Sequence, residues 1–553
     1  MTAAIDITAG QRKMLLALLH QFIPGVAVWA YGSRVKWTAR SNSDLDLVSF
    51  TTPAQGHLVS ELKEAFAESD LPFLVDFHVW DEVPERFHEI IRKEYVVLQE
   101  AEEKQLVEDA VGEWRSASIQ EVSEKVAMGP FGSSIKVETF VPQGVPVISG
   151  QHLRGTRLAD LDYNFISLEH AGQLANANVK RGDVVFTHAG NIGQVAYIPE
   201  SSKYERYVIS QRQFYLRPNT KKVLPEFIAY YFTSADGQHK LLANASSSGV
   251  PSIAQPVSYL RTIDIPVPPL SEQRAIAHIL GTLDDKIELN RRMNESLEAM
   301  ARALFQSWFV DFDPVRAKLD GRKPAGLDAT SAALFPDHFQ DSLLGHIPQG
   351  WEVCPLADKI ELLSGGTPKT GEPDYWDGDI PWFSVKDAPT ETDVWVIHTE
   401  KSVTELGISN SAAQIFPEKT TIITARGTVG KLALTGTPMA MNQSCYGVRG
   451  ITGYGDYFTY YSLRAATAQL QQRTHGTVFD TITRQTFETL DCVFPPPKLT
   501  VAFDHAVEPL LEQIRANLHQ SRTLSTLRDA LLPRLMSGKL SLHNGQLPEE
   551  ALV

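Results

Sequence analysis

Three aspartates near the start of the chain have the spacing of a metal-assisted phosphate site. Asp44 and Asp46 are two residues apart in an apolar stretch, so on a strand they point to the same side. Asp76 lies in a later apolar stretch and is a third candidate. Paired carboxylates suit Mg²⁺, which takes hard oxygen ligands and keeps substrate phosphates as further ligands. This pattern predicts a Mg²⁺–phosphate site.

The same stretch resembles the minimal nucleotidyltransferase family, on the Gly32-Ser33 turn, the segment Ser43-Asp44-Leu45-Asp46 and the later Asp76. The resemblance implies that Gly32 and Ser33 hold a phosphate of ATP or another nucleotide. It implies that Asp44, Asp46 and Asp76 hold the metal ion, with Asp76 also a candidate base. Trp37 stands where the family has glycine. Two hypotheses remain: an active transferase, or a domain that keeps the fold without the activity.

The surrounding pattern predicts a small α/β domain over residues 1–110. Residues 11–22 have the periodicity of an amphipathic helix, and residues 26–31 form an apolar run typical of a buried strand. Residues 84–110 are interpreted as a helix that ends in an acidic stretch. Residues 1–110 carry a net charge of −8 out of −15 for the whole chain, which argues against a free-standing nucleic-acid binder.

The composition of the 553 residues indicates a multidomain protein of the cytoplasm. No apolar run approaches the roughly 18 residues that a membrane span needs, and the first residues lack the pattern of a secretion signal. The three cysteines are far apart, without metal-ligand spacing, and are expected to be reduced thiols.

Two helices with matching apolar seams follow later in the chain, over 271–312 and 498–545. From Ile276 to Leu304 the seam positions recur in alternating steps of four and three, which is typical of a coiled coil. The same register returns 227 residues later, again with asparagine at the fifth position (Asn290 and Asn517). Two matching seams in one chain predict that the helices pair with each other, antiparallel.

Each helix closes one copy of an internal repeat. The first repeat covers 111–270 and the second repeat covers 351–497, with a linker over 313–350. Both copies hold Thr-x-x-Gly-x-x-Gly after an apolar strand, at Thr187 and Thr424. A phosphate loop is one interpretation, but a strand follows instead of a helix, so a tight strand–turn–strand corner is favoured.

Residues 111–545 resemble the specificity subunit of type I restriction–modification systems. The resemblance rests on the two repeats, the segment Pro268-Pro269-Leu270-Ser271-Glu272-Gln273, the segment Trp308–Val315 and the segment Gly345–Trp351. The second copy departs from it, with Pro496-Pro497-Lys498-Leu499, and the family usually lacks the N-terminal domain. The implied architecture is α/β and α+β multidomain: two target-recognition domains, each followed by a long coiled-coil helix.

The resemblance implies a DNA-binding subunit that does no bond chemistry itself. It reads a bipartite double-stranded DNA target and docks two modification subunits, which use S-adenosylmethionine, and restriction subunits, which use ATP. Base reading needs Arg, Lys, Asn and Gln, with Ser and Thr as helpers. The loop candidates are Arg154, Thr187, His188, Asn191, Gln211, Arg212 and Gln213 in the first repeat, and Lys369, Lys386, Arg426, Lys431, Gln443, Arg473, His475 and Arg484 in the second.

Two alternatives belong to other classes. The chain could be a nucleotidyltransferase whose activity lies in residues 1–110, with the remainder as a targeting module. It could also be a purely structural scaffold. A test with labelled ATP and Mg²⁺ addresses the first, and DNA binding with a modification subunit addresses the second.

Overall fold

The computed structural model describes residues 5–540 apart from 41–42, 52–55, 70, 81–82, 84–86, 89–90, 92, 100–113, 131, 133, 247–248 and 474–480. The chain divides into two compact units, residues 1–277 with 536–553 and residues 278–535. Within the described residues, no helix is both long enough and apolar enough to cross a membrane.

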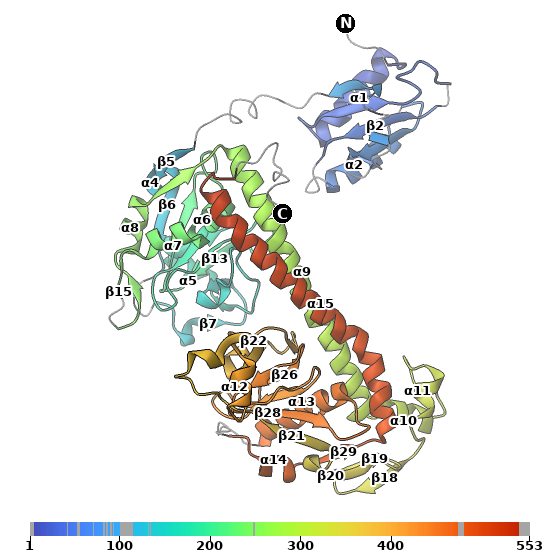
Figure 1. Cartoon of the computed structure of the whole chain (residues 1–553). Helices are drawn as coiled ribbons and strands as arrows, with labels where there is room; N and C mark the ends of the chain where they lie inside the picture. Colours follow the sequence, from blue (N-terminus) through green and yellow to red (C-terminus); the bar gives the residue numbers. More distant parts are fainter. Residues whose placement is uncertain are drawn as a thin grey trace. The chain divides into compact units, whose positions relative to one another are not determined.

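The N-terminal domain is a four-stranded sheet with two helices packed on one face (Figure 1). Its elements are α1 (Ala9–Phe22), β1 (Val28–Tyr31), β2 (Leu45–Ser49), α2 (Gly56–Ala67), β3 (Val75–Val79) and β4 (Val96–Gln99). The strand order is β3-β2-β1-β4, and β2 and β3 run parallel. Thr8 and Gln11 cap the start of α1 reciprocally, which satisfies two backbone donors. The predicted helix over 11–22 and the predicted strand over 26–31 are confirmed.

The predicted helix over 84–110 is wrong at its centre, because Val96–Gln99 form β4 and pair antiparallel with β1. Val96 and Leu98 are buried in the core, whereas Val97 between them is 37% exposed. This alternation is that of a strand, and β-branched residues favour it. Residues 84–86, 89–90, 92 and 100–110 of the predicted helix lie outside the described residues.

The first repeat contains two main sheets and several short helices. Its elements are β5 (Arg115–Ser118), α4 (Ile119–Val122), β6 (Ser123–Met128), β7 (Phe140–Val141), β8 (Val145–Ile148), β9 (Asn164–Ile166), α5 (Leu168–Gln173), β10 (Asn178–Lys180), β11 (Val184–Thr187), β12 (Val195–Tyr197), β13 (Arg206–Ile209), β14 (Gln213–Pro218), α6 (Pro225–Thr233), α7 (Ala235–Leu242), β15 (Ala245–Ser246), β16 (Ser252–Ile253), α8 (Pro256–Thr262) and β17 (Asp264–Val267).

The second repeat has the same plan. Its elements are β20 (Glu352–Pro355), β21 (Ile360–Ser364), β22 (Trp376–Phe383), β23 (Trp395–Val396), β24 (Lys401–Val403), α12 (Glu405–Ser409), β25 (Thr421–Thr424), β26 (Leu432–Thr435), β27 (Ala440–Met441), β28 (Cys445–Gly450), α13 (Asp456–Arg473), α14 (Arg484–Glu488) and β29 (Asp491–Phe494).

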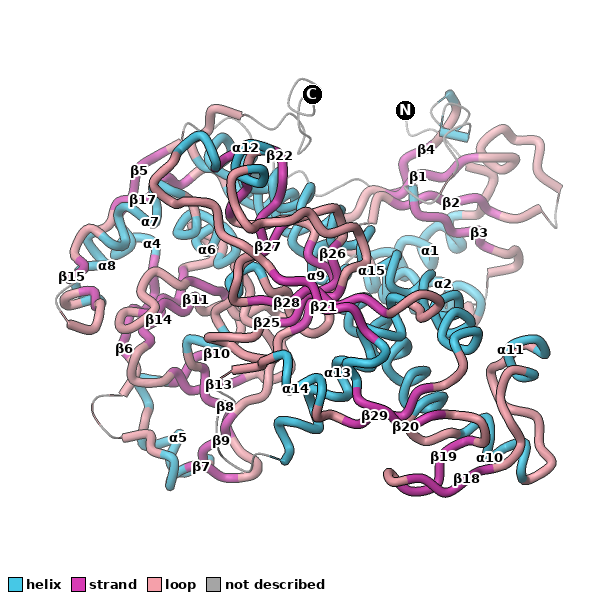
Figure 2. The backbone as a smooth tube through the Cα atoms, turned by 60° about the horizontal axis from the view of Figure 1, so that its bottom comes forward, coloured by secondary structure: helices cyan, strands magenta, loops and turns pink. Residues whose placement is uncertain are grey.

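Strand order confirms that the two domains are repeats. One sheet has the order β12-β11-β14-β6 in the first repeat. The equivalent sheet of the second repeat has the order β26-β25-β28-β21, with β23 as an additional edge strand beside β26. Figure 2 shows β21, β25 and β28 of the second repeat as neighbouring strands. The other sheet contains one parallel pair in each copy, β8 with β13 and β22 with β27.

The two long helices, α9 (Leu270–Phe309) and α15 (Pro497–Met536), are 40 residues each. Inside residues 278–535 they pair antiparallel, because contacts late in one helix fall early in the other. Asp284 contacts Arg528 at 2.8 Å, and Asn294 contacts Asn517 at 2.9 Å. Asn290, Asn294 and Asn517 are all buried. The predicted polar positions therefore lie in an internal coiled-coil seam, where they select register.

The second repeat is anchored on this helix pair. The Trp395 indole N–H donates to the carbonyl of Leu511 at 2.8 Å, and Arg464 contacts the buried Glu298 at 2.8 Å. Residues 313–350, expected as a linker, are themselves folded. They form α10 (Asp313–Leu319), α11 (Ala329–Ala333) and a hairpin of β18 (Phe339–Ser342) and β19 (Gly345–Pro348), and they contribute to the same hydrophobic core.

Each repeat is also fixed to the start of its helix by a buried polar side chain. In the first repeat the Gln273 amide accepts from the backbone of Leu224 and donates to the carbonyl of Lys222. In the second repeat the Thr500 hydroxyl, 227 residues later, accepts from the backbone of Gly455. The second copy, which departs from the Glu-Gln motif, therefore uses Thr500 in place of Gln273 for this attachment.

Candidate nucleotide site and nucleic-acid interface

Tyr31, Asp46 and Asp76 form one row across the open face of the N-terminal sheet. Tyr31 is the register partner of Asp46, and Asp46 is the partner of Asp76. Residues directly opposite each other on neighbouring strands point to the same face. Asp44 precedes β2 by one residue. The structure thus brings together the carboxylates that the sequence pattern selected. It adds Tyr31, for which the sequence offered only its place at the end of the apolar run over 26–31.

The carboxylates in this row repel one another. Burial and the charges of Asp76 and Asp44 raise the pKa of Asp46. Burial and the charges of Asp46 and Asp76 raise the pKa of Tyr31 to about 12. His78 lies 3.1 Å from Asp76 and is the basic group nearest to that carboxylate in the described contacts. A bound cation would relieve this repulsion between the carboxylates.

The turn after β1 packs directly against Asp46. Gly32 has φ +80°, and a Cβ at this position would lie 2.0 Å from an Asp46 carboxylate oxygen, so only glycine fits. Arg34 is buried and donates to the carbonyls of Asp6 and Ser43, which fixes the loop on both sides. Trp37 has φ +56° and is 61% exposed. It holds the left-handed conformation that glycine adopts without strain.

The donor set fits Mg²⁺ only together with a substrate. Among the described residues, no group of three or more His, Cys, Asp or Glu side chains is arranged to hold a metal ion by itself. Mg²⁺ commonly binds through one or two carboxylates, substrate phosphates and water. Asp46, supported by Asp44 and Asp76, can supply the carboxylates for such an ion, whose chemistry is to neutralise phosphate charge.

In both repeats the Thr-x-x-Gly-x-x-Gly motif forms a tight corner between antiparallel strands, which confirms the favoured interpretation. We call residues 187–194 and 424–431 the corner loops. Thr187 receives a hydrogen bond from Gly193 N–H at its carbonyl, and Thr424 receives the same bond from Gly430. Both motif glycines in each copy have positive φ. No helix follows either loop, so neither offers the helix N-terminus of a phosphate loop.

A second loop lies beside each corner loop. We call residues 210–213 and 442–445 the glutamine loops, after Gln211 and Gln443. His188 N–H donates to the Arg212 carbonyl at 2.9 Å, and Ala425 N–H donates to the Ser444 carbonyl at 2.8 Å. The same backbone bond in both repeats shows that the two pairs of loops are equivalent, as the sequence match of Ser210-Gln211 with Asn442-Gln443 predicts.

The first repeat separates its candidates into exposed and supporting residues. Arg154, Asn191, Gln211 and Arg212 are exposed on the loops, and His188 is half-buried. Thr187 and Gln213 are buried and hydrogen bonded to each other. These two support the loops instead of presenting polar atoms to DNA, which corrects their assignment as base contacts. Gln194, absent from the predicted set, donates to the carbonyls of Gly150 and Leu153. It thereby joins residues 149–154, which we call the third loop (equivalent to the loop that begins at Ser384 in the second repeat), to the corner loop.

In the second repeat the candidate side chains that the structure describes are exposed, but several of them already contact other residues of the chain. Lys369 is paired with Glu372 at 2.8 Å, Lys386 with Glu400 at 3.9 Å, and Arg484 donates to Ser364 at 3.3 Å. Gln443 accepts from the Thr367 hydroxyl. Arg426 and Lys431 are exposed on the corner loop. Arg473 ends α13, but its side chain, like the whole of His475, lies outside the described residues.

A third loop differs in charge between the repeats. Ser149 N–H donates to His152 Nδ1 at 3.0 Å, whereas Ser384 N–H donates to the Asp387 carboxylate at 2.8 Å. His152 is buried, and burial lowers its pKa. Because Nδ1 accepts, we assign the ring proton to Nε2, which faces the Asp162 carbonyl at 3.3 Å. The loop that carries Arg154 therefore depends on a neutral histidine.

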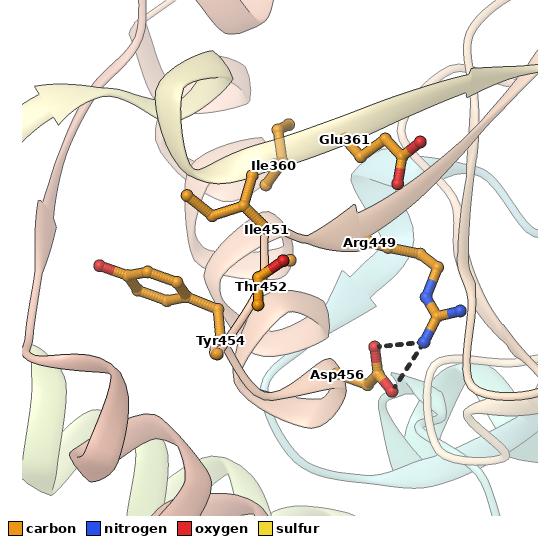
Figure 3. A pocket seen from close by; sticks show the side chains of 9 residues that line it. Ile360, Glu361, Arg449, Ile451, Thr452, Tyr454 and Asp456 are labelled. Carbon is orange, nitrogen blue, oxygen red and sulfur yellow. Dashed lines mark hydrogen bonds and ion pairs between the residues drawn. The ribbon is translucent and has the colours of Figure 1, made fainter.

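A hollow of about 600 Å³ lies at the end of β28 opposite to the glutamine loop (Figure 3). Arg449 contacts Asp456 there at 3.4 Å. Since Asp456 begins α13, this ion pair ties the strand to the helix. Arg449 is thereby engaged within the domain, and the two ends of β28 differ: one carries the glutamine loop and the other anchors α13.

Comparison with known proteins agrees with the repeat. The family model for the type I restriction modification DNA specificity domain matches residues 112–299 and 348–500. The chain is 27% identical over 412 residues to the type I restriction enzyme HindI specificity subunit of Haemophilus influenzae. The matched region covers 67% of this chain and 88% of that protein. A solved S subunit of a type I system from M. genitalium covers 76% of this chain and 96% of its own, with 15% identity and a TM-score of 0.46.

The N-terminal domain has a separate relative. The chain is 46% identical over 101 residues to the probable protein adenylyltransferase MntA of Haemophilus influenzae, which covers 18% of this chain and 89% of that protein. This similarity supports the nucleotidyltransferase-like domain. The specificity-domain model covers more than half of the chain, in both repeats. The chain therefore belongs to the DNA specificity family of type I restriction–modification systems, with a nucleotidyltransferase-like domain at its N-terminus.

Proposed function

We propose that each repeat reads one half of a bipartite double-stranded DNA target. The observation that carries the proposal is the pair of equivalent loops: both repeats hold a corner loop and a glutamine loop in the same backbone hydrogen bonds, but with different exposed side chains. Equal scaffolds with unequal polar side chains are suited to reading unequal sequences. The paired helices set the preferred separation of the two half-sites.

The chain works with partners in this proposal. Its net charge of −15 opposes tight binding to the phosphate backbone by the subunit alone. We infer that two modification subunits complete the phosphate contacts and methylate the DNA with S-adenosylmethionine, and that restriction subunits use ATP for cleavage. Binding of random-sequence DNA with and without modification subunits tests this. Equal affinity and equal selectivity with and without the modification subunits would contradict the inference that these subunits complete the phosphate contacts.

A second proposal concerns the N-terminal domain. We infer that it transfers the nucleotidyl group of ATP to a protein acceptor, supported by the row of Asp46 and Asp76, by Asp44 beside it and by the similarity to the MntA adenylyltransferase. Gly32 and Ser33 would approach the phosphates, and Asp76 would take the proton of the acceptor hydroxyl. The acceptor oxygen would bond to the α-phosphorus of ATP, and the bond between the α- and β-phosphates would break to release pyrophosphate. Incubation with labelled ATP, Mg²⁺ and co-expressed proteins should label an acceptor. An unlabelled sample, together with no ATP binding, would indicate a domain that has lost the activity.

A further inference from the structure

Each repeat presents one arginine from its pair of corner and glutamine loops. The arginine comes from a different loop of the pair in each repeat. In the first repeat Arg212 comes from the glutamine loop, and in the second repeat Arg426 comes from the corner loop. Their equivalent positions are Ser444 and Ala189. The equivalence of Ala189 and Arg426 is set by the backbone, because Ala189 bridges to Ser252 and Arg426 bridges to Thr481 in the same antiparallel manner.

The space around the loops matches this exchange. A Cβ on Gly190 would lie 3.3 Å from the Arg212 guanidinium, so the arginine lies across the corner loop of the first repeat. At Gly427, the equivalent position, a Cβ would meet nothing within 4 Å. In the second repeat Ser444 stands in the place of Arg212, and no side chain lies across the corner loop at Gly427.

Both arginines keep their hydrogen-bonding capacity. Arg212 and Arg426 are exposed, and neither guanidinium has a hydrogen bond or ion pair to another residue in the described part of the chain. Lys369 and Lys386 instead contact glutamates, whereas Lys431 on the corner loop of the second repeat shares this lack of an ion pair among the described residues. An arginine that no described residue engages keeps all five of its N–H donors for a ligand as far as these residues are concerned.

We propose that Arg212 and Arg426 each read one guanine, through the paired donors that arginine offers to guanine O6 and N7. This inference rests on the proposed function and specifies one base that each repeat reads. Each half-site then contains one G·C pair that depends on one arginine. Because the arginines stand at different positions of the same loop pair, the two guanines occupy different places relative to the loops.

The experiment uses the full chain with its modification subunits in cells without other DNA methylation, followed by genome-wide mapping of methylated sites. Arg212→Lys keeps the positive charge but loses the paired donors, so a guanine contact is lost and a phosphate contact is kept. The expected result is a loss of preference of about fivefold or more at one G·C pair in one half-site only. Arg426→Lys should relax one G·C pair in the other half-site.

A designed exchange provides the second test. Ala189→Arg combined with Arg212→Ser places the arrangement of the second repeat into the first. This variant should regain a guanine preference at another base pair of the same half-site. Unchanged preferences in both lysine variants, or a uniform loss of methylation without relaxation of any base pair, would overturn the proposal. Wild-type methylation without any bipartite target would instead contradict the proposed function itself.

Discussion

The Asn517 amide donates a hydrogen bond of 2.9 Å to the Asn294 amide oxygen across the seam between the two long helices. Asn294 in turn donates to Asp393 of the second repeat at 3.3 Å. Both asparagines are buried. This short chain of contacts joins the register of the helix pair to the position of one DNA-reading domain.

Replacement of Asn517 by leucine should destabilise residues 278–535 by about 1–3 kcal/mol, because the buried Asn294 oxygen loses its donor. The double variant Asn294→Leu with Asn517→Leu should recover much of this loss, since both polar groups then leave the seam. Thermal unfolding measures both. His519→Ala, on the exposed face of the same helix, is the matched control. Equal stability of Asn517→Leu and the control would contradict the role of the pair.

Removal of one heptad from each helix should shorten the preferred separation of the half-sites. Deletion of segments 284–290 and 511–517 would keep the heptad register. It would also remove Leu511, whose carbonyl accepts the hydrogen bond from Trp395 of the second repeat. Residues 281–287 and 524–530 face each other in the antiparallel pair and avoid that contact, since Asp284 and Arg528 leave together. Seven residues span about 10 Å of helix, or about 3 base pairs.

Methylated-site mapping of this double deletion should give both half-sites at reduced separation. The deletion of 281–287 alone is the control, because it removes seven residues from only one side of the seam and should abolish activity. An active double deletion with an unchanged separation would show that the helices do not set the distance.

The first half-site should lose recognition on mild acidification before the second does. Burial lowers the pKa of His152, so the folded state favours the neutral ring. The unfolded state then binds more protons in the window between the lowered pKa and the ordinary value near 6.5. Stability is therefore complete above about pH 6.5 and falls as the pH drops through this window. Asp387 occupies the equivalent place in the second repeat and accepts as a carboxylate.

Half-site selectivity measured from pH 7.5 to 5.5 tests this prediction. His152→Asn keeps an acceptor for the Ser149 N–H in the place of Nδ1 and does not titrate, although it is too short to reach the Asp162 carbonyl. This variant should hold the first half-site across the range. An identical pH profile for wild type and variant would exclude His152 as the cause.

Mg²⁺ should stabilise the N-terminal domain in the presence of ATP, and Asp46→Asn should remove this effect. The raised pKa of Asp46 means that the folded domain binds a proton more readily than the unfolded chain, so without metal its stability should rise as the pH falls through that raised pKa toward the ordinary value of 3.8. Asp46→Asn should flatten that dependence and leave the methylated sites unchanged. A Mg²⁺–ATP effect that persists in the variant would place the nucleotide elsewhere.

The sequence predicted the features that depend on periodicity. The steps of four and three identify the coiled-coil seam, and the paired amides at Asn290 and Asn517 identify its partner. The same reasoning failed at Val96–Gln99, because a short apolar run fits a helix or a strand and only pairing with β1 decides.

Side-chain accessibility could not be predicted either. Thr187 and Gln213 have the residue types of base readers, but the tertiary fold buries them against each other. The anchoring of the second repeat by Trp395 and Leu511 joins positions far apart in the sequence, which no local pattern reports.

Each repeat is expected to read its own half-site independently of the other. Replacement of residues 351–495 by the matching domain of a relative, in the full chain with its modification subunits, tests it most directly through the genome-wide map of methylated sites. One half of the target should change while the other half keeps its sequence. A target that changes in both halves, or in neither, would contradict it.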